Sequence, residues 1–519
     1  MIPCTLGQIA AVTGGALSAP EASEITVTGA VVTDSREAEP GSLYIARIGE
    51  NADGHVYTGS AAAAGAVAAM VTTAVTEVPY VLVDDVQQAF SALATHLIER
   101  SPDLTVVGVT GSSGKTTTKD LIAHVLTGLA PTVANVGSLN SEVGVPLTVC
   151  RITEATRHLV LEMGARGAGH VRYLTDMTHP SVGVVLNVGS AHLGEFGSQQ
   201  SIAAAKAELL DALPAGGLAV RNIDDPLVAA MPVPAGVNAL GFGLSEHADV
   251  RATNVLVNDD GCPTFNLEFK EQSFTVKLRL MGEYQVSNAL AAAAVALWLG
   301  MPPAEVASRL GEATPVSRYR MERHERSDGV TIINDAYNAN PESMKGALLT
   351  LARMGEAAVP ATDTDPAAAA SDGGRRRTWA VLGQMLELGP DSREQHRTIG
   401  ELARALGIDA VVAVGQGADI DALAAGAAGA TEAAGATSAA GATSAAEATG
   451  ATAGAVGERA AERLLDAAPP SVYRSASVGD AEDLLARTLS EGDLVLVKSS
   501  HGAGLRVLGE HLVEGASHP

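Results

Sequence analysis

The chain has 519 residues, too many for one hydrophobic core, so its length predicts two or three domains. Its formal net charge of −25 argues against DNA or RNA binding, because nucleic-acid backbones attract basic surfaces. The cysteines Cys4, Cys150 and Cys262 show no metal-ligand spacing, which predicts reduced thiols. No apolar run reaches the roughly 18 residues of a membrane span, and the first residues lack the basic start of a signal peptide. We therefore expect a cytoplasmic protein that does not bind nucleic acid and has no membrane span.

The segment 1–103 has the pattern of a small α/β domain. A Pro-Gly turn at residues 40–41 precedes a short apolar run that predicts a strand, and an alanine-rich stretch predicts a helix over residues 60–70. Ser35 and Arg36 stand just before the turn. Their hydroxyl and guanidinium groups are suited to a diphosphate, although the same pair also occurs on ordinary protein surfaces.

A strand, a glycine loop and a helix follow one another between residues 104 and 129. The β-branched run over 104–109 predicts a buried strand, and apolar residues at helical spacing over 121–129 predict a helix. The glycine loop between them reads G-x-x-G-K-T. Such a loop holds phosphates, with Lys115 reaching the β/γ-phosphates and Thr116 reaching Mg²⁺. The expected phosphate-binding residues are Gly111, Ser112, Ser113, Gly114, Lys115, Thr116 and Thr117.

This loop is shorter than the general P-loop motif, which has a glycine where this chain has Val109. The alternative is a Gly-Ser turn followed by a helix with a solvated lysine. The flanking strand and helix favour the phosphate-binding interpretation.

The segment 104–315 alternates strands and helices, which predicts a parallel, doubly wound sheet. Ligands bind beyond the carboxyl ends of such strands, where Glu162 and His192 stand. Beside a P-loop, Glu162 is a candidate Mg²⁺ ligand and His192 a candidate ligand of a second metal. Lys206, taken by itself, is typical of a solvated helix lysine.

From residue 316 the alternation restarts, which predicts a second Rossmann-like α/β domain over 316–519 without a P-loop of its own. Apolar runs over 330–334, 378–382, 410–414 and 494–497 predict its strands. Two inserts, near 356–377 and 422–456, are rich in small residues and lack large apolar periodicity. We expect flexible surface loops there, without chemistry; the alternative for the second insert is a weak alanine helix.

Several motifs resemble those of the Mur ligases of peptidoglycan synthesis, and the resemblance extends over nearly the whole chain apart from the two inserts. Asn334–Pro341 is the most discriminating, because sibling ligases carry other residues there. The motifs are Thr110–Lys119, Asn135–Pro146, Leu161–Ala165, Asn187–Gly197, Asn334–Pro341, Gly383–Gly389 and Val497–Ser500.

The resemblance implies three α/β domains, which bind a UDP-substrate, ATP and the incoming peptide. It implies an ATP- and Mg²⁺-dependent ligase that adds D-alanyl-D-alanine to UDP-N-acetylmuramoyl-tripeptide through an acyl phosphate. A monomer is the default expectation. Its ATP contacts beyond the P-loop are Asn288, Arg320, Asp335, Tyr337 and Asn338. Its substrate contacts are Ser35, Arg36, Asn140, Lys498 and Ser499, and its metal ligands are Thr116, Glu162, His192 and a carbamylated Lys206. Its catalytic residues are Lys115, Lys206, His192 and Asp335, the last as a candidate general base.

Two positions depart from the family pattern. Before Asn288 the family commonly has Gly-x-His-Asn, where this chain has Gly282-Glu283-Tyr284-Gln285, and before Arg320 it often has Pro-Gly in place of Arg318-Tyr319. The alternatives are another Mur-type or folylpolyglutamate-synthase-like ligase, a P-loop switch or kinase, and a non-catalytic paralogue.

Overall fold

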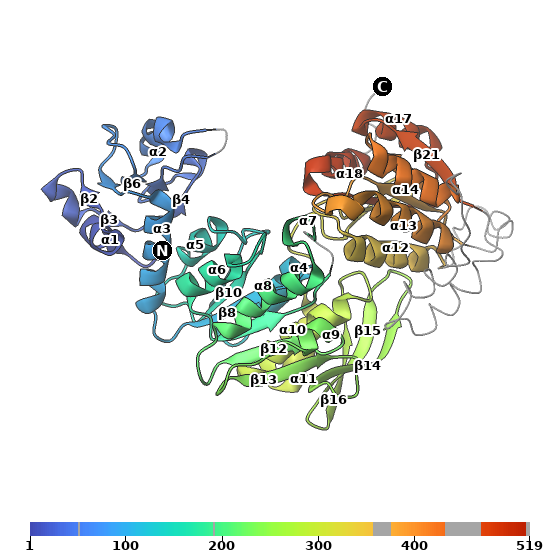
Figure 1. The fold of residues 1–519 in the computed structure, drawn as a ribbon, viewed down its shortest axis with the longest axis horizontal. Helices are drawn as coiled ribbons and strands as arrows, with labels where there is room; N and C mark the ends of the chain where they lie inside the picture. The colour runs from blue at the N-terminus through green and yellow to red at the C-terminus, as the bar shows by residue number, and fades with distance from the viewer. Residues whose placement is uncertain (50–51, 190–192, 357–374, 431–468, 515–519) are drawn as a thin grey trace.

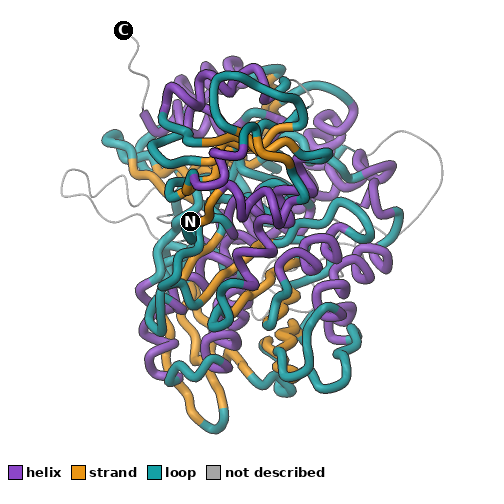
Figure 2. Tube along the Cα trace, turned by 90° about the vertical axis from the view of Figure 1, so that its left-hand side faces the viewer, coloured by secondary structure: helices purple, strands orange, loops and turns teal. Residues whose placement is uncertain are grey.

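The computed structural model describes residues 1–49, 52–189, 193–356, 375–430 and 469–514. Three α/β bodies follow one another along the chain, and the central body lies between the other two (Figure 1). Figure 2 shows the same chain from the side, with strands running between layers of helices. The predicted α/β class in three parts is confirmed. Among the described residues, no helix has both the length and the apolar character required to cross a membrane.

The N-terminal body is built on a five-stranded sheet with the order β2-β7-β6-β5-β4. Its elements are β1 (Cys4–Thr5), α1 (Leu6–Thr13), β2 (Ala16–Leu17), β3 (Thr26–Val27), β4 (Val31–Val32), β5 (Leu43–Ile45), α2 (Thr58–Ala64), β6 (Ala68–Val71), β7 (Tyr80–Leu82) and α3 (Val86–Glu99). The helix predicted over 60–70 is wrong beyond residue 64. Gly65, at φ +116°, ends α2, and the next residues form the buried central strand β6.

Helix α3 joins the N-terminal and central bodies. It packs against α1 on one side and against α5 (Gly144–Val149) and α6 (His170–Thr178) on the other, so one apolar cluster runs through both bodies. Thr95 Oγ1 donates to the Met177 carbonyl at 3.0 Å across this contact. The packing fixes the N-terminal body against the central sheet.

The central sheet has nine strands in the order β16-β15-β14-β13-β12-β11-β8-β10-β9. Its strands are β8 (Thr105–Thr110), β9 (Thr132–Ala134), β10 (His158–Glu162), β11 (Val182–Val185), β12 (Leu218–Asn222), β13 (Asn238–Gly243), β14 (Val250–Val257), β15 (Pro263–Phe269) and β16 (Gln272–Lys277). Its remaining helices are α4 (Lys115–Leu126), α7 (Leu193–Phe196), α8 (Gln199–Asp211), α9 (Pro226–Ala229), α10 (Gln285–Trp298) and α11 (Pro303–Glu312).

Helices cover both faces of this sheet, as a doubly wound arrangement requires. Helices α4, α10 and α11 pack on one face, and α5, α6 and α8 pack on the other. The sheet is not wholly parallel, because β15 and β16 extend its edge as an antiparallel hairpin. In β15 buried residues alternate with partly exposed ones, and β16 is mostly exposed, as expected of a sheet end with one solvated face.

The C-terminal sheet has the order β17-β18-β22-β19-β20-β21, and only β17 is antiparallel to its neighbour. Its elements are β17 (Glu322–Glu325), β18 (Thr331–Asn334), α12 (Pro341–Gly355), β19 (Thr378–Leu382), α13 (Ser392–Ala405), β20 (Ala410–Val414), α14 (Ala418–Ala428), β21 (Ser471–Ser475), α17 (Val478–Thr488), β22 (Leu494–Lys498) and α18 (Leu505–Glu514). Helices α12–α14 cover one face, and α17 and α18 cover the other.

The predicted inserts fall mainly outside the described residues. The loop predicted to begin at residue 422 is wrong for 422–428, because these residues belong to α14, in agreement with the alternative of an alanine helix. Helix α14 buries Leu423 and Ala427 against α13 and the sheet. Its small residues permit close packing: Gly426 lies so near the α13 backbone that a Cβ there would meet the Arg397 carbonyl oxygen at 2.2 Å.

Candidate active site

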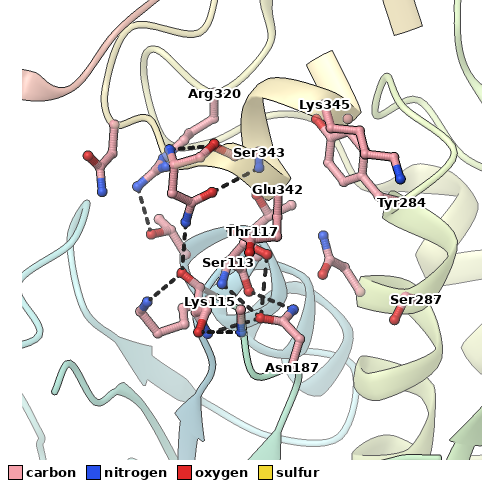
Figure 3. Close-up of a pocket in the computed structure, with 18 of the residues that line it drawn as sticks. Ser113, Lys115, Thr117, Asn187, Tyr284, Ser287, Arg320, Glu342, Ser343 and Lys345 are labelled. Carbon is pink, nitrogen blue, oxygen red and sulfur yellow. Dashed lines mark hydrogen bonds between the residues drawn. The ribbon is translucent and has the colours of Figure 1, made fainter. Parts of the chain in front are cut away.

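A cleft of about 1270 Å³ lies between the central and C-terminal bodies. The central body contributes the loops that follow β8, β10, β11 and β12, all at carboxyl ends of parallel strands. The C-terminal body contributes the loop after β18, the start of α12 and the loop after β22. Figure 3 shows Glu342 and Ser343 of α12 facing Ser113 and Thr117 of the glycine loop. The cleft therefore lies beyond the carboxyl ends of parallel strands, where open α/β sheets bind their ligands.

The glycine loop runs from the end of β8 into the first residue of α4. Gly114 has φ +78°, and a Cβ on it would lie 2.5 Å from Asn288 Oδ1, so both backbone conformation and space require glycine. The first N–H groups of α4 have no acceptor within the helix and face the cleft end of the sheet. This arrangement suits an anion such as a phosphate.

Asn187, just beyond β11, anchors the glycine loop. Its Oδ1 accepts hydrogen bonds from the N–H groups of Ser112 and Ser113, each at 2.9 Å, and its Nδ2 donates to the Ser113 carbonyl at 3.2 Å. Sequence reasoning placed Asn187 in a family motif but assigned it no contact. The feature that could have pointed to this contact is an amide side chain shortly after a buried strand, where loops of the site are expected.

Lys115 folds back over its own loop. Its Nζ donates to the carbonyl of Gly111 at 2.7 Å and to that of Ser112 at 3.4 Å. Burial lowers the pKa of this ammonium, the Glu162 carboxylate opposes that effect, and the Arg320 guanidinium adds to it. Lys115 is therefore held in the cleft among charged groups rather than in open solvent.

Four side chains form a polar cluster at the metal-candidate position. Thr116 Oγ1 donates to Glu162 Oε2 at 2.9 Å, and Asn140 Nδ2 donates to Glu162 Oε1 at 2.7 Å. The Ser138 hydroxyl lies 2.9 Å from Thr116 Oγ1. Glu162 is buried, so these contacts fix the direction of its carboxylate. Sequence reasoning identified three of these residues individually and missed Ser138.

This donor set fits Mg²⁺, which prefers oxygen ligands and usually takes only one or two carboxylates plus phosphates and water. Thr116 and Glu162 supply a hydroxyl and a carboxylate within hydrogen-bond distance of each other. Over the described part of the chain, no group of three or more His, Cys, Asp or Glu residues could hold a metal ion. His192, the expected second-metal ligand, lies outside the described residues.

Lys206, on α8, is only 4% exposed, which overturns the solvated-lysine interpretation of its local sequence. Burial and, to a smaller extent, the charge of Lys115 lower its pKa to about 7. The side chain lies behind the cleft wall rather than among the residues that line it. A lysine with this pKa is partly neutral at physiological pH, and only a neutral amine can react as a nucleophile.

The loop after β18 carries Asp335 and Tyr337, and Lys498 is the last residue of β22. Lys498 Nζ lies 2.6 Å from Asp335 Oδ2 and also donates to the Asn338 carbonyl at 2.9 Å, while Asp335 Oδ1 accepts from the Met321 N–H at 3.0 Å. Both oxygens of Asp335 are thus engaged. The pair ties together the two loops that form the C-terminal side of the cleft.

Other expected residues lie in different surroundings. Asn288 lines the cleft, where its Oδ1 accepts from Thr118 Oγ1 at 3.1 Å. Ser499 is fully buried and does not line the cleft, whereas Ser500 and His501 do. Ser35 and Arg36 lie in the N-terminal body, outside the cleft.

Arg36 is exposed, and its Nε donates to Asp34 Oδ1 at 2.9 Å. Hydrogen bonds from Arg36 lower the pKa of Asp34 to about 2.

The cleft lining carries both carboxylates and cations, and three of its cations stand among the groups described above. Lys115, Arg320 and Lys498 line the cleft, and Lys206 lies behind it. In the interactions described above, the Glu162 carboxylate acts on Lys115 and the Asp335 carboxylate acts on Lys498. The glycine loop and the start of α4 add backbone N–H donors. A triphosphate with one metal ion satisfies this combination.

Comparison with known proteins agrees with this geometry. Residues 109–296 match the Mur ligase middle domain, and residues 319–501 match the Mur ligase, glutamate ligase domain. The UDP-N-acetylmuramoyl-tripeptide–D-alanyl-D-alanine ligase of Mycobacterium bovis is 41% identical over 540 aligned residues, which cover 99% of this chain and 98% of that protein.

Two solved structures have the same fold over nearly the full length. The MurF crystal structure from Acinetobacter baumannii has a TM-score of 0.77 at 27% identity and covers 99% of each chain. The MurF ligase of Thermotoga maritima in complex with ADP has a TM-score of 0.70 at 27% identity, covering 94% of this chain and 97% of that one. The chain therefore belongs to the Mur ligase family.

Proposed function

We propose that this protein is an ATP-dependent ligase that joins D-alanyl-D-alanine to UDP-N-acetylmuramoyl-tripeptide in peptidoglycan precursor synthesis. The observation that carries the proposal is the single cleft in which the glycine loop, the Thr116–Glu162 pair and the Asp335–Lys498 loops meet. The name of the M. bovis relative, which matches over the whole chain, gives the substrates. The ADP complex of the T. maritima protein supports an adenine nucleotide as the phosphate donor.

The reaction has to make a poor electrophile reactive. A carboxylate oxygen of the tripeptide attacks the γ-phosphorus of ATP, the bond to the β-phosphate oxygen breaks, and ADP and an acyl phosphate form. The free amine of D-alanyl-D-alanine then attacks the acyl carbon. Phosphate leaves with the electrons of the C–O bond, the nitrogen loses a proton, and an amide results.

Residues of the central body would hold the triphosphate. The N–H groups at the start of α4 and the Lys115 ammonium would bind its phosphates, and Asn187 would keep the glycine loop in shape. Thr116 and Glu162 would hold Mg²⁺, which when bound neutralises charge that develops on the transferred phosphoryl group. Catalysis here is mainly positioning and charge stabilisation.

Residues outside the P-loop would bind the other parts of the substrates. Arg320, Tyr337 and Asn338 would contact the nucleotide, and Asn288 stands against the glycine loop on the same side. Ser35 and Arg36 would bind the diphosphate of the UDP-substrate in the N-terminal body. The proposed domains are therefore a UDP-substrate-binding domain over 1–103, an ATP-binding domain over 104–315 and a C-terminal ligase domain over 316–519.

Asp335 and Lys498 would act as a pair that shapes the C-terminal side of the cleft. A general base needs a free oxygen within reach of the proton that it accepts. The Asp335 carboxylate accepts from Lys498 Nζ and from the Met321 N–H, so a positioning role suits it better than proton transfer.

One assay separates the proposal from its alternatives. The protein is incubated with ATP, Mg²⁺, UDP-N-acetylmuramoyl-tripeptide and D-alanyl-D-alanine, and products are identified by mass spectrometry while phosphate is measured. We expect one phosphate for each new amide bond, and no amide when the dipeptide is replaced by a single amino acid. Amide formation with a single amino acid would indicate a different Mur-type ligase. Nucleotide hydrolysis or phosphoryl transfer without an amide product would indicate a switch or a kinase.

A further inference from the structure

The guanidinium of Arg320 stands against the metal-candidate cluster. Arg320 lies just before β17, yet its Nη2 is 3.2 Å from Thr116 Oγ1 and 3.3 Å from Ser138 Oγ in the central body. The same Thr116 hydroxyl contacts the buried Glu162 carboxylate. The positively charged guanidinium of Arg320 therefore lies beside the hydroxyls of Thr116 and Ser138 and close to the Glu162 carboxylate.

The guanidinium is held there by weak contacts. Besides the two neutral hydroxyls, it lies over the ring of Tyr337, with its Cζ 4.2 Å from the ring centre. Its Nε is buried and has no hydrogen-bond partner among the residues that the structure describes. A buried donor without a partner is costly, so the position is tolerated rather than optimal. Such a group can be displaced by a ligand that binds the oxygens more strongly.

We propose that the Ser138 hydroxyl belongs to the same cation site as Thr116 and Glu162, and that Arg320 is the resident cation of this site until a divalent metal replaces it. The inference rests on the proposed use of a metal–nucleotide complex. It adds Ser138 to the site and gives Arg320 a role before the nucleotide binds.

Electrostatics gives the physical reason for the exchange. A buried carboxylate needs a nearby positive charge, and Arg320 supplies one together with Lys115 when no metal is bound. A divalent ion at the Thr116 and Glu162 oxygens would lie only a few ångströms from the guanidinium and would repel it. Once displaced, the guanidinium has several donors available for phosphate oxygens, which its planar fork binds well.

The first test measures Mn²⁺ binding to the nucleotide-free full-length protein, with free Mn²⁺ followed by electron paramagnetic resonance. Removing the competing charge in Arg320→Gln is expected to tighten Mn²⁺ binding by about fivefold or more, and Arg320→Lys should stay near the wild type. Arg318→Gln is the matched control. Arg318 lies two residues earlier, is largely exposed and bonds Glu510 Oε1 at 2.9 Å, so its replacement should leave Mn²⁺ affinity unchanged.

The second test removes the added oxygen. Ser138→Ala is expected to weaken Mn²⁺ binding about three- to tenfold, and Ser138→Thr, which keeps a hydroxyl, should restore most of the affinity. Thermal unfolding by circular dichroism verifies that each variant is folded.

Unchanged Mn²⁺ affinity in folded Arg320→Gln and Ser138→Ala would overturn the inference and leave the ligase function intact. Absence of Mn²⁺ and of ADP binding in the wild-type protein would instead overturn the proposed function, and the inference with it. The two failures are thus distinguishable.

Discussion

The Oδ1 atom of Asn187 lies 2.9 Å from the backbone nitrogen of Ser113, and the same oxygen accepts from the neighbouring Ser112 N–H. One amide side chain at the end of β11 therefore sets the conformation of the glycine loop at the end of β8. These hydrogen bonds come from the protein itself and hold the loop in one conformation. A loop that is already in its binding shape loses less conformational entropy when the ligand binds.

Asn187→Ala is expected to raise the KM for ATP about tenfold, because the loop loses hydrogen bonds worth roughly 1 kcal/mol each. Asn187→Asp keeps the acceptor and loses the donor to Ser113, and it places a negative charge near the phosphates, so it should be worse than alanine. Steady-state kinetics over a range of ATP concentrations measures both variants. An unchanged KM in Asn187→Ala would show that the loop keeps its shape without this side chain.

Lys115→Ala is expected to lower kcat roughly 10²–10³-fold, the usual loss when a charge-stabilising donor is removed from a reacting group. The fold should remain, because Lys115 Nζ bonds only to carbonyls of its own loop in the described structure. Phosphate release and circular dichroism are measured on the same samples. The exposed lysine Lys277 provides the control variant Lys277→Ala. Turnover near the wild-type rate in Lys115→Ala would refute the phosphate-binding role of this loop.

The buried Asp335–Lys498 pair is expected to behave as a unit in stability. Asp335→Asn leaves the Lys498 ammonium buried without its charged partner, and should lower the free energy of unfolding by about 3–5 kcal/mol. Lys498→Met leaves the carboxylate in the same position and should cost a similar amount.

The double variant removes both charges, so it should be less destabilised than the sum of the two single variants. Urea unfolding monitored by fluorescence gives the three values. Simple additivity in this cycle would show that the two charges do not stabilise each other in solution.

Lys206 is expected to make stability depend on pH. Its pKa is lowered to about 7, so between about pH 7 and its ordinary pKa near 10.5 the unfolded chain binds more protons than the folded one. The contribution of this group to stability therefore rises with pH across that window and is least favourable below pH 7. Lys206→Met, measured by urea unfolding in CO₂-free buffer, should stabilise the protein most at pH 6 and least near pH 10. Lys277→Met should show no such trend.

The same lowered pKa predicts carbamylation near neutral pH, because CO₂ reacts with the neutral amine. In ¹³C-bicarbonate the protein should show a carbamate carbon by NMR, which strengthens as the pH rises through about 7 and is absent in Lys206→Met. A carbamate would place an anionic oxygen where the ammonium now adds positive charge beside Lys115. If the signal persists in Lys206→Met, another amine is the modified one.

The cleft is expected to close around its ligands. In the structure α12 approaches the glycine loop at its N-cap, where Asn340 Nδ2 lies 3.5 Å from the Ser112 carbonyl oxygen, yet about 1270 Å³ remains open beside it. Small-angle scattering with a non-hydrolysable ATP analogue and the UDP-tripeptide should show a smaller radius of gyration than the ligand-free protein. The N-terminal body should contribute little, since α3 already packs it against the central sheet. An unchanged scattering curve under saturating ligands would argue against closure.

Most of the fold was predictable from the sequence because its signals are local. Strand β19 has the bounds that its apolar run predicts, and the strand, glycine loop and helix around Lys115 follow one another within 26 residues, 104–129. Predictions failed where composition was ambiguous: alanine suits both the helix α2 and the buried strand β6, and small residues suit both a loop and the packed helix α14. The antiparallel edge strands β15 and β16 went unpredicted, because many of their residues are partly or fully exposed and leave no continuous apolar run.

By itself the sequence determined the α/β class, the phosphate loop and, through its resemblance to a known family, the names of most candidate site residues. Only the tertiary structure decided how they meet: Thr116 contacts Glu162 across 46 residues of sequence and Arg320 across 204. It also decided that Lys206 is buried, that Asp335 is paired with Lys498, and that Ser138 and Asn187 belong to the site. The physical reason is that local apolar patterning sets strands and helices, whereas hydrogen bonds, charge pairing and pKa depend on which chain segments the packed sheets bring together.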